Sequence, residues 1–178
     1  MKDSEIKEIF TNYTYILIDR REKKLHIKEY YDKLNIHNEF STVDYGDYSI
    51  KIISNPILKN TEDIVFNVSV ERKASLDELA NNLTKGKARF MREMERCKKD
   101  EGNMIIMIEN ATYMDIVQHN YKSDLAPKSF LALLHTIYDR YDVPFIFIDK
   151  EASSLFVYNY LKYYCREWLK RYEVKGDD

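Results

Sequence analysis

The sequence places a carboxylate and an amine two residues apart at the end of an alternating apolar run. Glu71, Arg72 and Lys73 close the segment 64–73, whose alternation of apolar and polar residues is typical of a β-strand. Because successive side chains of a strand point to opposite faces, Glu71 and Lys73 share one face and Arg72 points to the other. Hydrolysis of a phosphodiester needs carboxylates that hold a hard divalent cation and a cationic group that holds the phosphate or the water. These three residues are therefore the first candidates for catalysis.

Further carboxylates follow other predicted strands. Asp47 comes after Gly46, which permits a tight turn and can bring the carboxylate near the neighbouring strand end. Asp19 and Glu22 follow the apolar run 13–19 and would add to the same sheet edge. Carboxylates gathered in this way raise one another's pKa values unless a cation is bound. The sequence therefore predicts a divalent metal site.

The spacing of these residues resembles a known motif. Gly46-Asp47, then Glu71-Arg72-Lys73, then Asp77 after three residues resemble the Gly-Asp, variable gap, Glu-Arg-Lys, three residues, Asp motif of XPF-type nucleases in the PD-(D/E)XK superfamily. The segments Asp19 to Glu22 and Gly86 to Phe90 also resemble this family, so that the likeness covers about residues 13–169. Glu93 stands where many relatives carry Gln.

The resemblance implies a fold, an activity and a role for each residue. The fold is α/β, a restriction-endonuclease-like core with a central mixed β-sheet flanked by helices on both faces. The activity is that of a metal-dependent DNA endonuclease acting at branched DNA or at junctions of single strand and duplex. Asp47 and Glu71 would ligate Mg²⁺ or Mn²⁺, Asp19 and Glu22 would complete the acidic site, and Lys73 would position or activate water. Arg72 and Asp77 would organise the strand end and the phosphate contacts.

Simpler explanations exist for the same residues. One alternative is that Glu71 and Lys73 form an exposed ion pair at the end of the strand. Asp77 suits the first turn of any helix, because the helix dipole favours an acid there. Asp19 and Glu22 have basic neighbours with which to pair. At the level of function, the alternatives are a catalytically idle DNA-binding or scaffold domain and a Holliday-junction resolvase or restriction-type nuclease.

DNA contact should be local, since the chain has a net charge of −2 and non-specific binding to phosphates needs clustered basic residues. The predicted helix 87–100 carries Arg89, Arg92 and Arg96 on its polar side. These residues are candidates for DNA binding, although a basic helix face is often only solvated.

The remaining pattern predicts the elements that must position these residues. Ser75 and Glu78 form a capping box, so a helix should begin directly after the strand that ends at Lys73. The apolar run 104–109 is typical of a strand covered on both faces, and Pro127 should open a helix that ends before Pro144. Other helices are predicted at 4–10, 25–36 and after 148, and other strands at 13–19, 39–44, 48–53 and 145–148.

At 178 residues the chain suits one domain. We expect a single domain over 1–178 with a core at about 13–171, an N-terminal helical extension at 1–12 and a tail at 173–178. Cys97 and Cys165 are expected to be reduced core residues. No apolar run reaches the length of a membrane span or secretory signal, so we expect no membrane and a cytoplasmic location, in a bacterium or a phage-infected host. The Pro127 helix and the last helix could support a homodimer.

Overall fold

The computed structural model describes residues 1–172, in which seven strands and seven helices form two compact units. The first unit comprises Met1–Val43, Tyr48–Val68 and the chain from Ser154 onward. The second comprises Asp44–Asp47 and Ser69–Ser153. The predicted tail 173–178 lies outside the described residues. None of the described helices is long and apolar enough to cross a membrane.

The first unit is built on a small mixed sheet. Its elements are α1 (Asp3–Asn12), β1 (Thr14–Asp19), α2 (His26–Lys33), β2 (Asn38–Ser41), β3 (Tyr48–Ile52), β4 (Ile64–Val65) and the part of α7 (Lys150–Arg171) from Ser154 on. Strand β1 pairs in parallel with β2 and antiparallel with β3, and β4 pairs antiparallel with β3. Because parallel strands need a crossover, α2 occupies the connection from β1 to β2.

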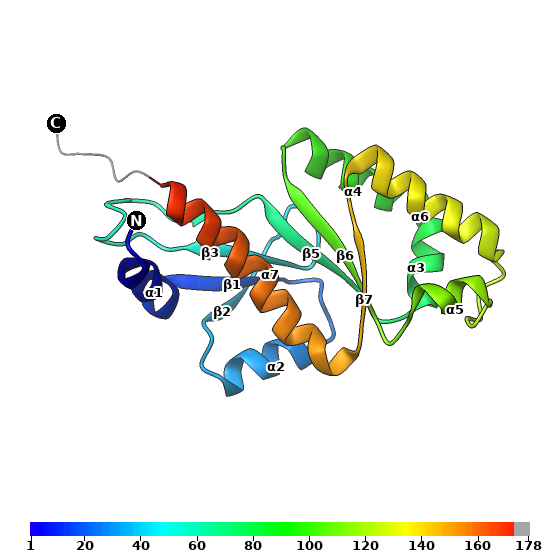
Figure 1. Cartoon of the computed structure of the whole chain (residues 1–178), viewed down its shortest axis with the longest axis horizontal. Helices are drawn as coiled ribbons and strands as arrows, with labels where there is room; N and C mark the ends of the chain where they lie inside the picture. The colour runs from blue at the N-terminus through cyan, green and yellow to red at the C-terminus, as the bar shows by residue number, and fades with distance from the viewer. Residues whose placement is uncertain (173–178) are drawn as a thin grey trace. The chain divides into compact units, whose positions relative to one another are not determined.

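The second unit surrounds an apolar strand. Its elements are β5 (Val68–Lys73), α3 (Leu76–Leu83), α4 (Lys87–Lys99), β6 (Asn103–Glu109), α5 (Tyr113–Val117), α6 (Pro127–Tyr141) and β7 (Phe145–Ile148). The strands follow one another in the order β5-β6-β7, and β6 and β7 are parallel. Helices α3, α4 and α6 contact one another, and α4 contacts β6 (Figure 1). Every β6 residue after Asn103 is buried, as the prediction of a covered strand requires.

Local signals set the helix ends near the site. The Ser75 hydroxyl accepts the backbone N–H of Glu78 at 3.2 Å and caps α3. Glu78 reaches back to the N–H of Ala74, one residue earlier than a regular capping box, at 2.9 Å. Helix α3 therefore begins directly after β5, as predicted, and a second helix begins after Gly86.

The structure differs from the sequence prediction in three elements. The predicted strand 64–73 is divided into β4 and β5, and the Phe66 ring between them meets Trp168 with the ring centroids 5.2 Å apart. Helix α5 was not predicted, since its five residues are too few to show a helical period. Strand β7 is half-buried rather than buried, because it is the last strand of its sheet. Cys97 and Cys165 are buried free thiols, as predicted.

Candidate active site

The end of β5 holds Glu71 and Lys73 on one face of the strand. Their side chains meet, with Lys73 Nζ donating to Glu71 Oε1 at 2.5 Å, and both residues are buried. The Lys73 ammonium also lies over the ring of Phe90 from α4, 5.0 Å from the ring centroid. Glu71 and Lys73 are therefore not the exposed ion pair of the simpler explanation. They form a partly enclosed pair of opposite charge in the second unit.

The Gly46-Asp47 turn brings a second carboxylate to this strand end. Asp47 donates its N–H to the carbonyl of Val70 at 2.9 Å, and its Oδ2 accepts the N–H of Arg72 at 2.8 Å. These two bonds fix Asp47 to the backbone on both sides of Glu71. The structure thus brings Asp47, Glu71 and Lys73 together, as the prediction required.

Gly46 is needed for this approach. Its φ of +78° lies in a region that side chains other than glycine rarely adopt. A Cβ here would lie 3.0 Å from Cβ and Oγ of Ser69 and 3.1 Å from the carbonyl oxygen of Val70. The turn can therefore lie against β5 only with glycine at this position.

Helix α4 supplies a third acid to the turn. Glu93 Oε1 accepts the N–H of Gly46 at 2.9 Å, which ties the turn to α4 as well as to β5. Glu93 also acts electrostatically on Glu71. The resemblance marked the position of Glu93, where many relatives carry Gln, but no local pattern predicted its contact with Gly46.

The charges of the site influence one another's pKa values. Burial alone would lower the pKa of Lys73, but the carboxylates of Glu71 and Asp47 raise it above its ordinary value. Burial raises the pKa of Glu71, Lys73 opposes this, and the like charge of Glu93 adds to the rise. Lys73 is therefore held as an ammonium beside carboxylates that are poorly solvated.

Arg72 points to the other face of β5 and has a partner there. Its guanidinium donates to Glu109 Oε2 at 2.6 Å, and the two side chains are 4% and 1% exposed. Glu109 ends the apolar strand β6 and was not among the predicted site residues. In this arrangement the Arg72 side chain faces a carboxylate inside the unit, away from any phosphate at the surface.

Asp77 holds a loop. Its Oδ1 accepts the N–H groups of Lys122 and Ser123, both at 2.8 Å. It also lies in the first turn of α3, where an acid is favoured by the helix dipole. This contact connects the start of α3 to the segment between α5 and α6.

Asp19 and Glu22 lie in the first unit, and the residues that gather at the end of β5 lie in the second. Asp19 accepts hydrogen bonds from the Arg21 side chain at 2.7 and 3.0 Å and from the N–H of Val43 at 3.1 Å. Burial would raise the pKa of Asp19, but the hydrogen bonds from Arg21 and Val43 hold it below its ordinary value. Glu22 accepts the N–H of Lys24 at 2.6 Å. Their part in an acidic site stays a prediction.

Comparisons with known proteins show the family and the fold of the chain. The model of the family described as the ERCC4 domain matches residues 18–160. The chain belongs to the ERCC4 domain family. No curated protein matches the sequence.

Two solved structures share the fold of this ERCC4 domain. XPF from Aeropyrum pernix is 19% identical with a TM-score of 0.62, over 92% of this chain and 67% of that chain. The same protein in complex with DNA is 17% identical with a TM-score of 0.58, over 86% of this chain and 66% of that one. The ERCC4 domain described here thus spans about two thirds of each. The predictions of an XPF-type nuclease domain and of an α/β, restriction-endonuclease-like fold with a mixed sheet are confirmed.

The donor set of the ERCC4 domain suits a hard divalent cation. Asp47 and Glu71 provide carboxylate oxygens, which Mg²⁺ and Mn²⁺ prefer, and burial raises the pKa of Glu71. Within residues 1–172, no three His, Cys, Asp or Glu side chains gather closely enough to hold a metal ion. Mg²⁺ usually binds one or two carboxylates and keeps several waters, so Asp47 and Glu71 are sufficient in number.

The arginines predicted to bind DNA, Arg89, Arg92 and Arg96, lie on α4 of the ERCC4 domain. Arg89, Arg92 and Arg96 are exposed, and Arg96 donates to the carbonyl of Asp44 at 3.0 Å. Since Glu93 and Phe90 on the same helix contact the turn and Lys73, α4 joins the basic residues to the candidate site within one unit.

Proposed function

We propose that this chain is a metal-dependent DNA endonuclease that hydrolyses phosphodiester bonds at branched or junction DNA. The observation that carries the proposal is the meeting of Asp47, Glu71 and Lys73 at the end of β5, in a chain of the ERCC4 domain family. A role in DNA repair or recombination is consistent with such a substrate. A homodimer and a cytoplasmic location stay predictions.

Each residue has a distinct part in this proposal. Asp47 and Glu71 hold Mg²⁺, or Mn²⁺ in its place, and this ion when bound supplies Lewis acidity toward the phosphate. Lys73 is an ammonium, because its carboxylate neighbours raise its pKa, so it acts as a hydrogen-bond donor that holds the scissile phosphate or orients water. Gly46 and Glu93 position Asp47 through the turn. Arg72 and Asp77 position the strand end and the adjoining loop.

Cleavage assays on flap, fork and four-way DNA substrates test this proposal. We expect nicking of one strand with Mg²⁺ and none with a chelator. Asp47→Asn and Lys73→Met should each reduce the rate about 100-fold or more, as removal of a group that stabilises the transition state does. Both variants should still bind the DNA. Asp139→Asn and Lys128→Met, at exposed positions on α6, are the matched controls and should cut normally.

The alternatives predict other outcomes in the same assays. Binding of every substrate without cutting by the unmodified chain would favour an idle DNA-binding or scaffold domain and reject the proposal. Cutting restricted to four-way junctions would indicate a Holliday-junction resolvase. Cutting of unbranched duplex at one sequence would indicate a restriction-type nuclease.

A further inference from the structure

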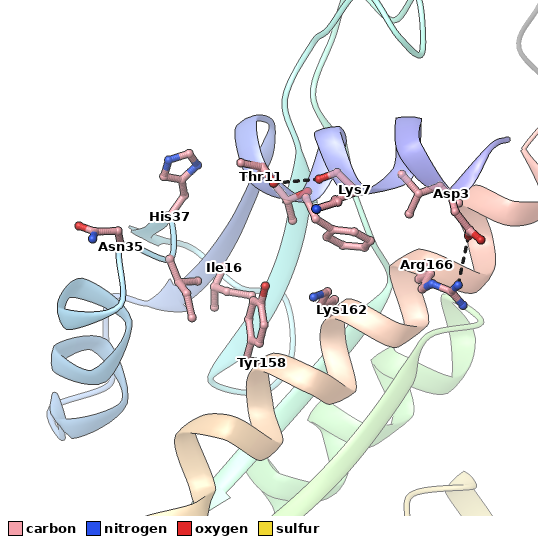
Figure 2. Close-up of a pocket in the computed structure, with 13 residues that line it drawn as sticks. Asp3, Lys7, Thr11, Ile16, Asn35, His37, Tyr158, Lys162 and Arg166 are labelled. Carbon is pink, nitrogen blue, oxygen red and sulfur yellow. Dashed lines mark hydrogen bonds and ion pairs between the residues drawn. The ribbon is translucent and has the colours of Figure 1, made fainter.

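The first unit contains a cavity that has no part in the candidate active site. It has a volume of about 470 Å³, within the range of small-ligand sites. Its walls come from α1, β1, the connection between α2 and β2, and α7 (Figure 2). Every lining residue belongs to the first unit.

The lining is cationic in a chain whose net charge is −2. Lys7, Lys162 and Arg166 face it, together with the single acid Asp3, which accepts a bond from Arg166 at 3.2 Å. In the described part of the chain, Lys7 and Lys162 have no carboxylate within ion-pair distance. The cavity therefore keeps an excess of positive charge that suits an anion.

Lys162 lies among aromatic rings. Its ammonium is 5.4 Å from the ring centroid of Phe10 and 5.2 Å from that of Tyr158. Figure 2 shows Lys162 and Tyr158 projecting from α7 toward α1. The rings hold the lysine side chain in place without neutralising its charge, so an anion can approach the ammonium from the cavity.

The rest of the wall combines apolar side chains with the polar side chains of Asn35 and His37 and two threonine hydroxyls. Ile6, Ile16 and Ile36 line the cavity beside the two rings, and the hydroxyls of Thr11 and Thr14 are already bonded to backbone carbonyls at 2.9 and 3.0 Å. A ligand that fits must combine an anionic group with a flat apolar body. A nucleoside phosphate has both, with its phosphate for the cations and its base for the apolar wall.

We propose that this cavity binds an unpaired nucleotide of single-stranded DNA, with the phosphate at Lys162 and Lys7 and the base against the apolar wall beside Tyr158. The inference rests on the proposed function, because it takes DNA as the ligand. A single-stranded tail is the part of a junction substrate whose bases are free to leave the stack. The cavity thus gives the protein a means to prefer DNA that carries a tail.

Fluorescence anisotropy of the full chain, with a chelator present so that no DNA is cut, tests this inference. The probes are one duplex with blunt ends and the same duplex with a tail of about eight thymidines, a length within the site size of single-strand binding proteins. We expect the tail to tighten binding about tenfold, the size of one stacking and phosphate contact. Lys162→Met removes the charge, keeps most of the aliphatic stem and should abolish this gain. Lys170→Met, which lies on α7 outside the cavity, should retain it.

Crosslinking gives a second measurement that does not depend on a variant. A 4-thiothymidine placed in the tail should crosslink to α7 or α1 near Tyr158 and Lys7. Crosslinks found only in the second unit would overturn the inference, as would equal affinity for blunt and tailed duplex. Both of these results concern DNA binding and do not change the outcome of the cleavage assay. Absence of cleavage would likewise leave binding of the tail unchanged, so the two proposals can fail independently.

Competition distinguishes a DNA strand from a free nucleotide, which has the same chemistry. Thymidine 5′-monophosphate should displace the tail only weakly, and thymidine or inorganic phosphate alone should displace it less still, because each lacks one half of the ligand. Tight binding of the monophosphate, with no gain from a tail, would assign the cavity to a free nucleotide and overturn the proposal.

Discussion

Asp19 is a buried carboxylate whose hydrogen bonds contribute to stability, whatever part it has in the chemistry. It accepts hydrogen bonds from Arg21 and Val43, and its pKa lies below the ordinary value. A carboxyl group with a lowered pKa in the folded state stabilises the protein above its ordinary pKa, and this contribution is lost as the pH falls through the folded value. The hydrogen bonds of Asp19 should therefore stabilise the fold at neutral pH and not in strong acid.

We expect Asp19→Asn to lower the free energy of unfolding by about 1–3 kcal/mol at neutral pH, since it weakens hydrogen bonds to a charged group. The difference from the unmodified chain should shrink as the pH falls below about 4, the ordinary pKa of an aspartate. Urea unfolding at several pH values measures this, with Glu8→Gln at an exposed site on α1 as the control. Unchanged stability together with lost cleavage would instead support the predicted place of Asp19 in the acidic site.

The sequence predicts the site residues that are set by local patterns better than it predicts contacts between residues far apart in the chain. The shared face of Glu71 and Lys73 follows from strand alternation, and Gly46 signals a turn that can deliver Asp47. The partner of Arg72 is Glu109, 37 residues away, and that pairing depends on β6 following β5 in the sheet. No local pattern specifies it. The contact of Glu93 with Gly46 is equally hard to predict from the sequence, because the two residues are 47 positions apart.

The elements around the site are joined by the Arg72–Glu109 pair, which connects β5 to β6. Both side chains are almost fully buried, so removal of one leaves an uncompensated charge in the interior. We expect Arg72→Met or Glu109→Leu alone to lower the free energy of unfolding by about 3–5 kcal/mol. The double variant should recover most of the loss, because two apolar side chains can replace a buried ion pair. Chemical denaturation of the four proteins gives the complete cycle.

DNA binding by the double variant separates two roles for Arg72. If Arg72 only positions the strand, the refolded double variant should bind DNA as well as the unmodified chain does. A double variant that recovers its stability but binds DNA several-fold more weakly would show that Arg72 contacts phosphate, as the resemblance implied. Arg72→Lys alone is a further control, because it retains a positive charge opposite Glu109.

Elements with strong local signals were predicted well. Ser75 starts α3, and Pro127 starts α6, which ends at Asp142 in the left-handed conformation before Pro144. The break between β4 and β5 was not predicted, because Phe66 fits the alternation of a continuous strand and its neighbours in sequence include no Gly or Pro. Helix α5 depends on Thr112 and Asp115 capping each other, a signal too short to stand out.

At the scale of the whole molecule, the sequence pattern does not predict how the chain passes between the two compact units. The single domain expected over 1–178 stays a prediction. The described chain forms two compact units, and it returns to the first at Ser154. Helix α7 continues through that point without a break. Periodicity therefore predicts the helix but not the unit to which each part belongs.

The net charge of −2 makes any DNA contact a local property of the surface. Arg89 and Arg92 are exposed on α4, the helix whose Phe90 and Glu93 reach the candidate site. Each phosphate contact releases counterions, so its loss reduces the slope of log affinity against log salt concentration by about 0.9. We expect Arg89→Gln and Arg92→Gln each to flatten the slope by about this amount and to weaken binding equally for all DNA sequences.

Arg96 provides an internal comparison within the same helix. Its guanidinium already donates to the carbonyl of Asp44, so Arg96→Gln should change the salt slope less than the other two substitutions do. Lys128→Gln, an exposed change on α6, is the control for net charge alone. Titrations of one duplex over a range of salt concentrations measure all four variants. Equal slopes for all of them would mean that the basic side of α4 is only solvated and that the DNA follows another surface.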